Sequence, residues 1–246
     1  MPNKPAQEPT PARPRDGQGD WDPIAAFKAR ADFRQFWDWA EKQDVSRETI
    51  GRLARFTALL LKWQQRINLI SGKTAESVWV RHILDSAQLV VHLPRPPGRI
   101  LDLGSGAGLP GVILSIMTDH ELHLAEADSR KIAFLRVALR ETGSQAVLHE
   151  GRIEELPDLQ PDIITARAFA PLDRLLSISR TQHHRDLVFW LHKGREVNSE
   201  LTGAASWTTL KAEVFDSITA SDGHILKLSG HDRKSRLVRQ GKQLNG

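Results

Sequence analysis

The chain has 246 residues and a formal net charge of +4, with 26% charged and 40% hydrophobic residues. These totals are ordinary for a globular protein of one domain with appendages. No apolar run is long enough to span a membrane, and no targeting segment begins the chain. We therefore expect a cytoplasmic protein without membrane contact. The absence of cysteine excludes disulfides, thiolate metal sites and methylation of a pyrimidine C5 through a cysteine adduct, and no metal site is expected.

The first 97 residues are expected to form a proline-rich arm and a helical region. Residues 1–20 contain five prolines among small polar residues, which predicts a disordered arm. Residues 21–97 form the helical region, which starts with an aromatic-rich segment at 21–42. A clear helix is expected from its N-cap at Ser46 to about residues 68–71. A second helix is expected over residues 77–92. Its helical spacing places Arg81, His82 and Asp85 on one face, opposite Ile83, Leu84, Ala87, Val90 and Val91.

Residues 98–230 show strand and helix patterns in alternation. Strands are expected near 100–103, 122–126, 146–149, 162–166 and 187–192, with helices near 110–118, 129–142 and 171–180. Two weaker strands near 213–217 and 225–228 complete a sheet of seven strands. This alternation predicts an α/β, Rossmann-like fold with a mostly parallel sheet covered by helices on both faces. Ligands of such sheets bind at the carboxyl ends of the strands.

A glycine-rich loop follows the first strand, with the sequence Asp102-Leu103-Gly104-Ser105-Gly106-Ala107-Gly108. Glu126 ends the next apolar run, where a carboxylate can hold ribose hydroxyls. The loop also fits the dinucleotide pattern G-x-G-x-x-G, but its spacing from the strand favours S-adenosylmethionine over NAD. On that interpretation Asp102 lies near the positive end of the cofactor. A glycine turn without a ligand is the remaining alternative.

Five features fall at the carboxyl ends of expected strands and should meet at one edge of the sheet. They are Gly104, Glu126, Gly151–Glu154, Arg167 and Lys193. Methyltransferases that act on exocyclic amines carry an Asn/Asp-Pro-Pro-aromatic motif after the fourth strand, and this chain has Ala166-Arg167-Ala168-Phe169 there. An arginine suits an acceptor that needs no deprotonation, such as guanine N7, or a phosphate.

Plainer interpretations of these charged residues remain open on the residues alone. Arg167 can be a structural ion-pair partner, and Lys193 can belong to a solvated turn rather than meet phosphate or a guanine edge. The cluster of Arg81, His82 and Asp85 can be a solvated group of salt bridges.

Six motifs in order resemble the bacterial RsmG family, also called glucose-inhibited division protein B. The resemblance covers about Leu59 to Leu201. The motifs are Trp63-Gln64-Gln65-Arg66-Ile67-Asn68-Leu69, Arg81-His82-Ile83-Leu84-Asp85-Ser86, Asp102–Gly111, Lys131-Ile132-Ala133-Phe134-Leu135-Arg136, Gly151-Arg152-Ile153-Glu154-Glu155 and Ala166-Arg167-Ala168.

The resemblance implies a class I S-adenosylmethionine-dependent methyltransferase fold with an N-terminal helical cap. It implies 7-methylguanosine formation at one position of 16S rRNA, near the decoding site, with 16S rRNA or the small ribosomal subunit as partner. It raises Arg81, His82 and Asp85 to candidates at the edge of the site. We expect Arg81, His82 and, from its place after the fifth strand, Lys193 to be the catalytic residues. The cofactor contacts that the resemblance implies are Gly104, Gly106, Leu109, Glu126, Ile153, Glu154 and Arg167.

The C-terminal residues 231–246 carry five basic side chains against Asp232. Such a tail suits a polyanion such as RNA, and equally a solubilising terminus. We expect a monomer. The alternatives are a methyltransferase acting on another RNA or a small molecule, and a non-catalytic RNA-binding protein that holds S-adenosylmethionine structurally.

Overall fold

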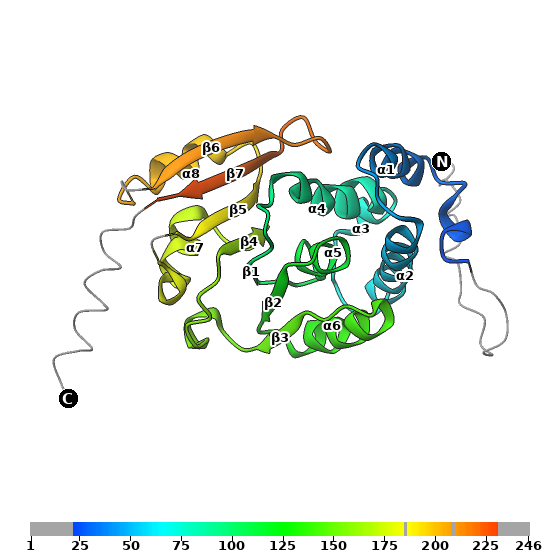
Figure 1. The fold of residues 1–246 in the computed structure, drawn as a ribbon, viewed down its shortest axis with the longest axis horizontal. Helices are drawn as coiled ribbons and strands as arrows, with labels where there is room; N and C mark the ends of the chain where they lie inside the picture. Colours follow the sequence, from blue (N-terminus) through cyan, green and yellow to red (C-terminus); the bar gives the residue numbers. More distant parts are fainter. Residues whose placement is uncertain (1–21, 185, 208–209, 231–246) are drawn as a thin grey trace, which may run out of the picture.

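The computed structural model describes residues 22–184, 186–207 and 210–230. Its centre is a seven-stranded sheet with the strand order β3-β2-β1-β4-β5-β7-β6 (Figure 1). Strands β1 to β5 are parallel, and β7 runs antiparallel to both β5 and β6. The strands are β1 (Arg99–Leu103), β2 (Glu121–Glu126), β3 (Val147–Glu150), β4 (Ile163–Arg167), β5 (Val188–Lys193), β6 (Lys211–Asp216) and β7 (His224–Ser229). All seven expected strands are confirmed, with ends shifted by at most two residues.

The register aligns the carboxyl ends of the parallel strands. Leu103 pairs with Ala125, Glu126 with Glu150, and Arg167 with His192. The central strands are buried on both faces because helices cover both, as parallel sheets require. The residues that follow these strands therefore meet at one edge, as the sequence predicts.

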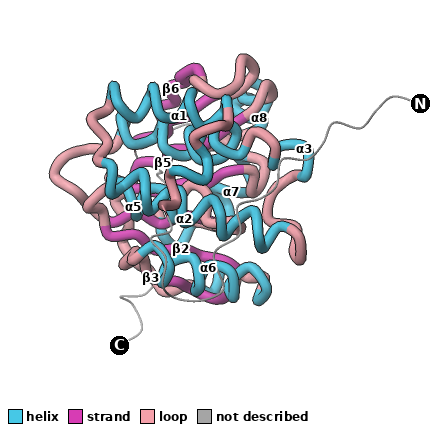
Figure 2. The backbone as a smooth tube through the Cα atoms, turned by 90° about the vertical axis from the view of Figure 1, so that its right-hand side faces the viewer, coloured by secondary structure: helices cyan, strands magenta, loops and turns pink. Residues whose placement is uncertain are grey.

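Helices cover the two faces of the sheet in unequal layers (Figures 1 and 2). Three helices, α2 (Arg47–Gln64), α5 (Gly111–Met117) and α6 (Ser129–Thr142), pack together over one face. On the other face α7 (Leu172–Ile178) packs against α8 (Val197–Gly203). Helix α6 has the bounds that the sequence predicts, because Asp128 caps its first turn and Gly143, at φ 65°, ends it. Helix α8 was not expected.

The aromatic-rich N-terminal segment docks on the rest of the chain. It contains the short 3-10 helix η1 (Ala25–Phe27) and α1 (Ala31–Lys42). The rings of Phe27, Phe33 and Phe36 surround Trp79, with centroid separations of 5.1, 4.7 and 4.9 Å. The same apolar cluster continues into α2, α5 and α6. The described part of the helical region thus shares its core with the sheet domain.

Helix α2 begins as expected but ends earlier. The Ser46 side chain accepts a hydrogen bond from the Thr49 backbone N–H and caps the helix. The last helical residue is Gln64, four or more residues before the expected end. The Gln64 side chain accepts bonds from the N–H groups of Leu69 and Ile70 and donates to the Ile70 carbonyl. This side chain therefore stabilises a loop where the sequence predicts more helix, before the short α3 (Gly72–Ala75).

The expected regular helix over residues 77–92 is wrong in detail. The chain forms a π-helical turn, η2 (Trp79–Leu84), then the short α4 (Asp85–Ala87) and a 3-10 segment, η3 (Gln88–His92). A wide turn followed by a tight one changes which side chains share a face. His82, assigned to the polar face, is 6% exposed, whereas Val91, assigned to the apolar face, is 56% exposed.

The expected arm at residues 1–20 and the expected tail at 231–246 lie outside the described residues. Within the described part of the chain, no helix is both long enough and apolar enough to cross a membrane.

Candidate active site

Two adjoining cavities open at the carboxyl edge of the sheet. The first, of about 570 Å³, lies over the ends of β1, β2 and β3, and Gly104, Glu126, Ile153 and Glu154 are among its lining residues. The second, of about 440 Å³, lies over the ends of β4 and β5 and includes Lys193. Residues 168–171 line both cavities. This place, between β1 and β4, is the point where strand order reverses and where such sheets bind ligands.

The glycine loop and the tip of β2 are joined through one carboxylate. Gly104 and Gly106 have φ angles of 63° and 54°, which glycine adopts without a steric penalty. Glu126 accepts a hydrogen bond from the Gly106 N–H at 2.8 Å, and its other oxygen accepts from the N–H groups of Ala127 and Asp128. The carboxylate therefore fixes the loop beside the first cavity while it also lines that cavity.

Asp102, which we expected near the positive end of a cofactor, is not among the residues that line the first cavity. Its side chain is fully buried and accepts hydrogen bonds from the Thr165 hydroxyl at 2.8 Å and the Gly111 N–H at 3.2 Å. Burial raises the pKa of this carboxyl to about 6. Because the side chain lies between β4 and the start of α5, it anchors the helix behind the loop.

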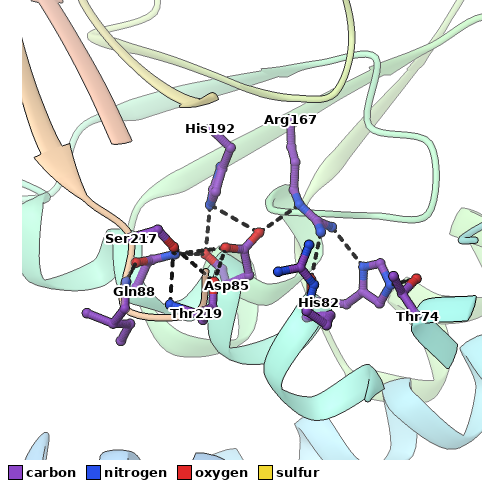
Figure 3. Close-up of polar contacts among 10 residues, drawn as sticks. Thr74, His82, Asp85, Gln88, Arg167, His192, Ser217 and Thr219 are labelled. Carbon is purple, nitrogen blue, oxygen red and sulfur yellow. Dashed lines mark hydrogen bonds and ion pairs between the residues drawn. The ribbon is translucent and has the colours of Figure 1, made fainter. Parts of the chain in front are cut away.

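Arg167 connects the end of β4 to the N-terminal helical region (Figure 3). Its Nε lies 2.9 Å from an Asp85 carboxylate oxygen. One terminal nitrogen lies 3.0 Å from His82 Nδ1, and the other donates to the Arg81 carbonyl at 2.7 Å. All three guanidinium nitrogens thus have partners on the π-helical turn or just after it. Arg167 is the ion-pair partner that the sequence left as one alternative.

His82 must be neutral to fit this arrangement. Arg167 only donates, so His82 Nδ1 accepts, and the ring donates from Nε2 to the Thr74 hydroxyl at 2.7 Å. Thr74 in turn donates to the Ser71 carbonyl. Burial and the nearby Arg167 cation lower the pKa of His82 to about 3. A histidine in this state stays neutral at neutral pH and does not act as a general acid there.

Asp85 holds the other end of the network against the C-terminal strands (Figure 3). One of its carboxylate oxygens accepts from the Thr219 hydroxyl at 2.6 Å and from the Gln88 amide at 2.9 Å. His192 Nε2 donates to the Asp85 backbone carbonyl at 2.7 Å. Burial raises the carboxyl pKa, but the cationic neighbours and the Thr219 bond outweigh burial, so the pKa of Asp85 lies below its usual range.

Lys193 forms a buried ion pair in the second cavity. Its Nζ lies 2.6 Å from Glu200 Oε2, and the lysine side chain is only 6% exposed. The same carboxylate oxygen accepts the Leu172 N–H at the start of α7. Sequence reasoning missed Glu200 because helix α8, which carries it, was not expected. The spacing of seven residues between the two partners, across a tight turn, gave no periodic signal.

The structure separates the expected site residues into four groups. Gly104, Glu126, Ile153 and Glu154 line the first cavity, and Lys193 lines the second. Arg81, His82 and Arg167 lie together but are not among the lining residues of either cavity. Gly106 and Leu109 are also absent from the linings of both cavities. The Gly106 N–H bonds to Glu126, and Leu109 is 6% exposed in the apolar cluster that includes α2, α5 and α6.

The first cavity fits S-adenosylmethionine. Its volume is in the range of cofactor sites, about 300 to 1,000 Å³. It combines an open glycine backbone, a carboxylate at a strand tip and the buried Ile153 side chain, which suits an adenosine group. Within the described residues, no group of three or more histidine, aspartate or glutamate side chains is arranged to hold a metal ion.

The sheet order, the glycine loop and the edge cavity define a Rossmann-like methyltransferase fold. The PH0226 protein from Pyrococcus horikoshii superposes with a TM-score of 0.55 at 12% identity, over 69% of this chain and 99% of that one. A ribosomal protein L11 methylase from Lactobacillus delbrueckii gives 0.51 at 12% identity, over 64% and 80%. A predicted O-methyltransferase from Agrobacterium tumefaciens gives 0.51 at 16% identity, over 62% and 82%.

The chain belongs to the GidB family, described as rRNA small subunit methyltransferase G, whose model matches residues 49–228. Ribosomal RNA small subunit methyltransferase G of Rhodospirillum rubrum is 48% identical over 184 residues, 75% of this chain and 92% of that protein. The protein of the same name from Rhodospirillum centenum is 44% identical over 185 residues, 75% and 86%. The family match is wider at both ends than the motifs indicated.

Proposed function

We propose that this protein transfers the methyl group of S-adenosylmethionine to N7 of one guanine in 16S rRNA, near the decoding site. The family to which the chain belongs supports small-subunit rRNA as the substrate. The observation that carries the choice of N7 is the sequence at the end of β4. Arg167 stands there, bound to Asp85, where an amine methyltransferase places a group that accepts a proton.

Guanine N7 needs no such group, because its lone pair carries no proton at neutral pH. S-adenosylmethionine supplies an electrophilic methyl group when it is bound. The protein then contributes alignment of the two reactants and electrostatics. We propose that Glu126 binds the ribose hydroxyls, since Oε2 accepts only one of the three backbone bonds. Ile153 and Glu154 hold the adenine end, and Gly104 faces the methionine part.

Arg81, His82 and Arg167 act by positioning in this proposal. They fix the π-helical turn against the end of β4, directly before the segment 168–171 that lines both cavities. Lys193 is the one expected catalytic residue that faces the second cavity. The proposed substrate places the reaction in the cytoplasm, on free 16S rRNA or a small-subunit particle.

The test is calorimetric titration with S-adenosylmethionine, followed by labelled methyl transfer to unmodified 16S rRNA and to 30S subunits. We expect binding, transfer, and 7-methylguanosine in the nucleoside digest. Transfer to a different nucleotide would contradict guanine N7 as the acceptor and keep the methyltransferase activity. Binding without transfer to RNA or to small molecules would favour a non-catalytic RNA-binding protein, and absence of binding would contradict the cofactor as well.

A further inference from the structure

The second cavity lies beside the proposed cofactor cavity and is separated from it by Phe169. The ring of Phe169 packs on Gly104, so that a Cβ at Gly104 would collide with it. The side chain is 37% exposed although it is large and apolar, and it lines both cavities. A half-exposed aromatic ring at the junction of two cavities is a surface on which a base can stack.

The far wall of the second cavity presents a donor and an acceptor side by side. Lys193 Nζ donates to Glu200 Oε2 at 2.6 Å and to the Ala170 carbonyl at 3.4 Å. An ammonium group has three donors, so a third is left among the partners that the described residues supply. Glu200 Oε2 takes the bonds from Lys193 and Leu172 N–H, and within the same part of the chain Oε1 is left to accept others. Helix α8 and the end of β5 fix both side chains.

This pattern matches the Watson–Crick edge of guanine. That edge presents the acceptor O6 next to two donors, N1–H and the N2 amine. Adenine has only one donor group on this edge, its N6 amine, next to the acceptor N1, so it lacks the second, adjacent donor that guanine offers to the carboxylate. Enzymes that act on an extruded base read its Watson–Crick edge by hydrogen bonds and stack its face on apolar side chains.

We infer that the second cavity binds the acceptor guanine, with Lys193 donating to O6, Glu200 accepting from N1–H and the N2 amine, and Phe169 stacking on the base. Glu200 is then a specificity-determining residue. The inference rests on the proposed function, since it names how the same site selects its substrate. With its Watson–Crick edge held by the wall at β5, the base leaves N7 free of protein donors.

The test compares RNA fragments that carry guanine or inosine at the methylated position. Inosine keeps O6, N1–H and N7 but lacks the N2 amine. We expect the parent protein to methylate the inosine fragment with kcat/KM lower by about 10- to 100-fold, the usual effect of losing one hydrogen bond to a charged group. Glu200→Gln should lower kcat/KM for guanine and reduce the preference for guanine over inosine toward one, while affinity for S-adenosylmethionine stays unchanged.

Glu196→Gln is the matched control, because Glu196 is exposed and one helical turn before Glu200; it should behave as the parent. An unchanged preference in a folded Glu200→Gln variant would overturn the inference, and so would a loss of cofactor affinity that matches the loss of transfer. If that variant does not fold, equal rates on guanine and inosine with the parent protein would overturn it instead. Failure of the proposed function is distinct, because the parent would then not methylate the guanine fragment at all.

Discussion

His82, Arg167 and Asp85 show how each residue in a buried polar network fixes the charge of its neighbours. Arg167 needs an acceptor on His82 Nδ1, and that requires a neutral imidazole. Asp85 needs to be ionised to balance Arg167. The helical spacing that grouped Arg81, His82 and Asp85 was informative, but the partner of the cluster is Arg167, which is distant in sequence.

The depressed pKa of His82 makes a prediction about stability and pH. The pKa of the folded state is about 3, below the unfolded value of 6.5. The unfolded chain therefore binds the proton first, and stability is lost as pH falls below about 6.5. Between pH 6.5 and pH 5, the parent should lose about 1.5 kcal/mol more free energy of unfolding than His82→Gln. Denaturant unfolding at the two pH values measures this difference.

Asp102 acts with the opposite sign and is present in both proteins. Its folded pKa is raised from 3.8 to about 6, so its contribution to stability is lost as pH rises through that range. It cancels in the comparison of the parent with His82→Gln. Equal pH dependence in the two proteins would show that His82 binds its proton equally well in the folded and unfolded chains.

Replacement of Arg167 should destabilise the protein through the charge that it leaves behind. Arg167→Ala leaves Asp85, with 15% of its side chain exposed, without its guanidinium partner, and we expect a loss of about 3 kcal/mol. Arg167→Lys should not restore it, because one ammonium cannot reach three partners in a plane. The double variant Arg167→Met with Asp85→Asn should lose less than Arg167→Ala. A fully stable Arg167→Ala with weakened cofactor binding by calorimetry would instead assign Arg167 to the cofactor.

At the scale of elements, helix α5, which follows the glycine loop, packs closely against β1 and β2. A Cβ at Gly111, the first residue of α5, would lie 2.3 Å from a methyl carbon of Leu124 and 2.6 Å from an Asp102 oxygen. Both neighbours are buried. The close approach of α5 to the sheet therefore depends on the missing side chain at this position.

Two glycine-to-alanine changes should shift stability in opposite directions. Gly111→Ala forces buried atoms apart and should cost about 2 kcal/mol. Gly51→Ala, inside α2, adds a Cβ that meets nothing within 4 Å. It should stabilise the protein by about 0.5 to 1 kcal/mol, because alanine loses less backbone entropy in a helix. Thermal unfolding of both variants tests this, and equal shifts would mean that α5 can move away from the sheet.

At the scale of the whole molecule, the N-terminal helices and the sheet form one body. Trp79 lies among three phenylalanine rings of the N-terminal segment, and Arg52 on α2 donates to the Thr142 carbonyl at the end of α6. The C-terminal strands belong to the same sheet, and Thr219, between β6 and β7, adds a hydrogen bond to Asp85. Residues from three distant parts of the chain therefore hold this body together.

The basic residues at 231–246 lead to a prediction about RNA binding for the complete chain. Each phosphate contact releases counterions, so removing residues 231–246 should flatten the dependence of RNA affinity on salt. We expect the slope of log affinity against log salt to change by about 0.7 per lost contact on single-stranded RNA. A tail of equal length with its lysines and arginines replaced by glutamine is the control. An unchanged slope would assign these residues no role in RNA binding.

Apolar runs, helix caps and the glycine and proline residues between elements were sufficient to predict the sheet. Each of these signals lies within a few residues of the strand or helix that it marks. The seven strands, α6 and the Ser46 cap were predicted in this way. The π-helical turn and helix α8 were not, since their conformations depend on packing against Trp79 and on the Leu172 and Lys193 contacts of Glu200. The early end of α2 depends on one side chain, Gln64, whose loop contacts have no periodic pattern.

The sequence by itself determined the fold class, the glycine loop and the arrival of Glu126, Arg167 and Lys193 at one edge, because parallel strands all end at the same edge of a sheet. Only the tertiary structure decided what those side chains do there. It placed Glu126 on the loop backbone, Arg167 on Asp85 and Lys193 on Glu200. The reason is physical: a buried charge takes its state from partners in space, and the partners of Glu126, Arg167 and Lys193 lie 20, 82 and 7 residues away along the chain, respectively.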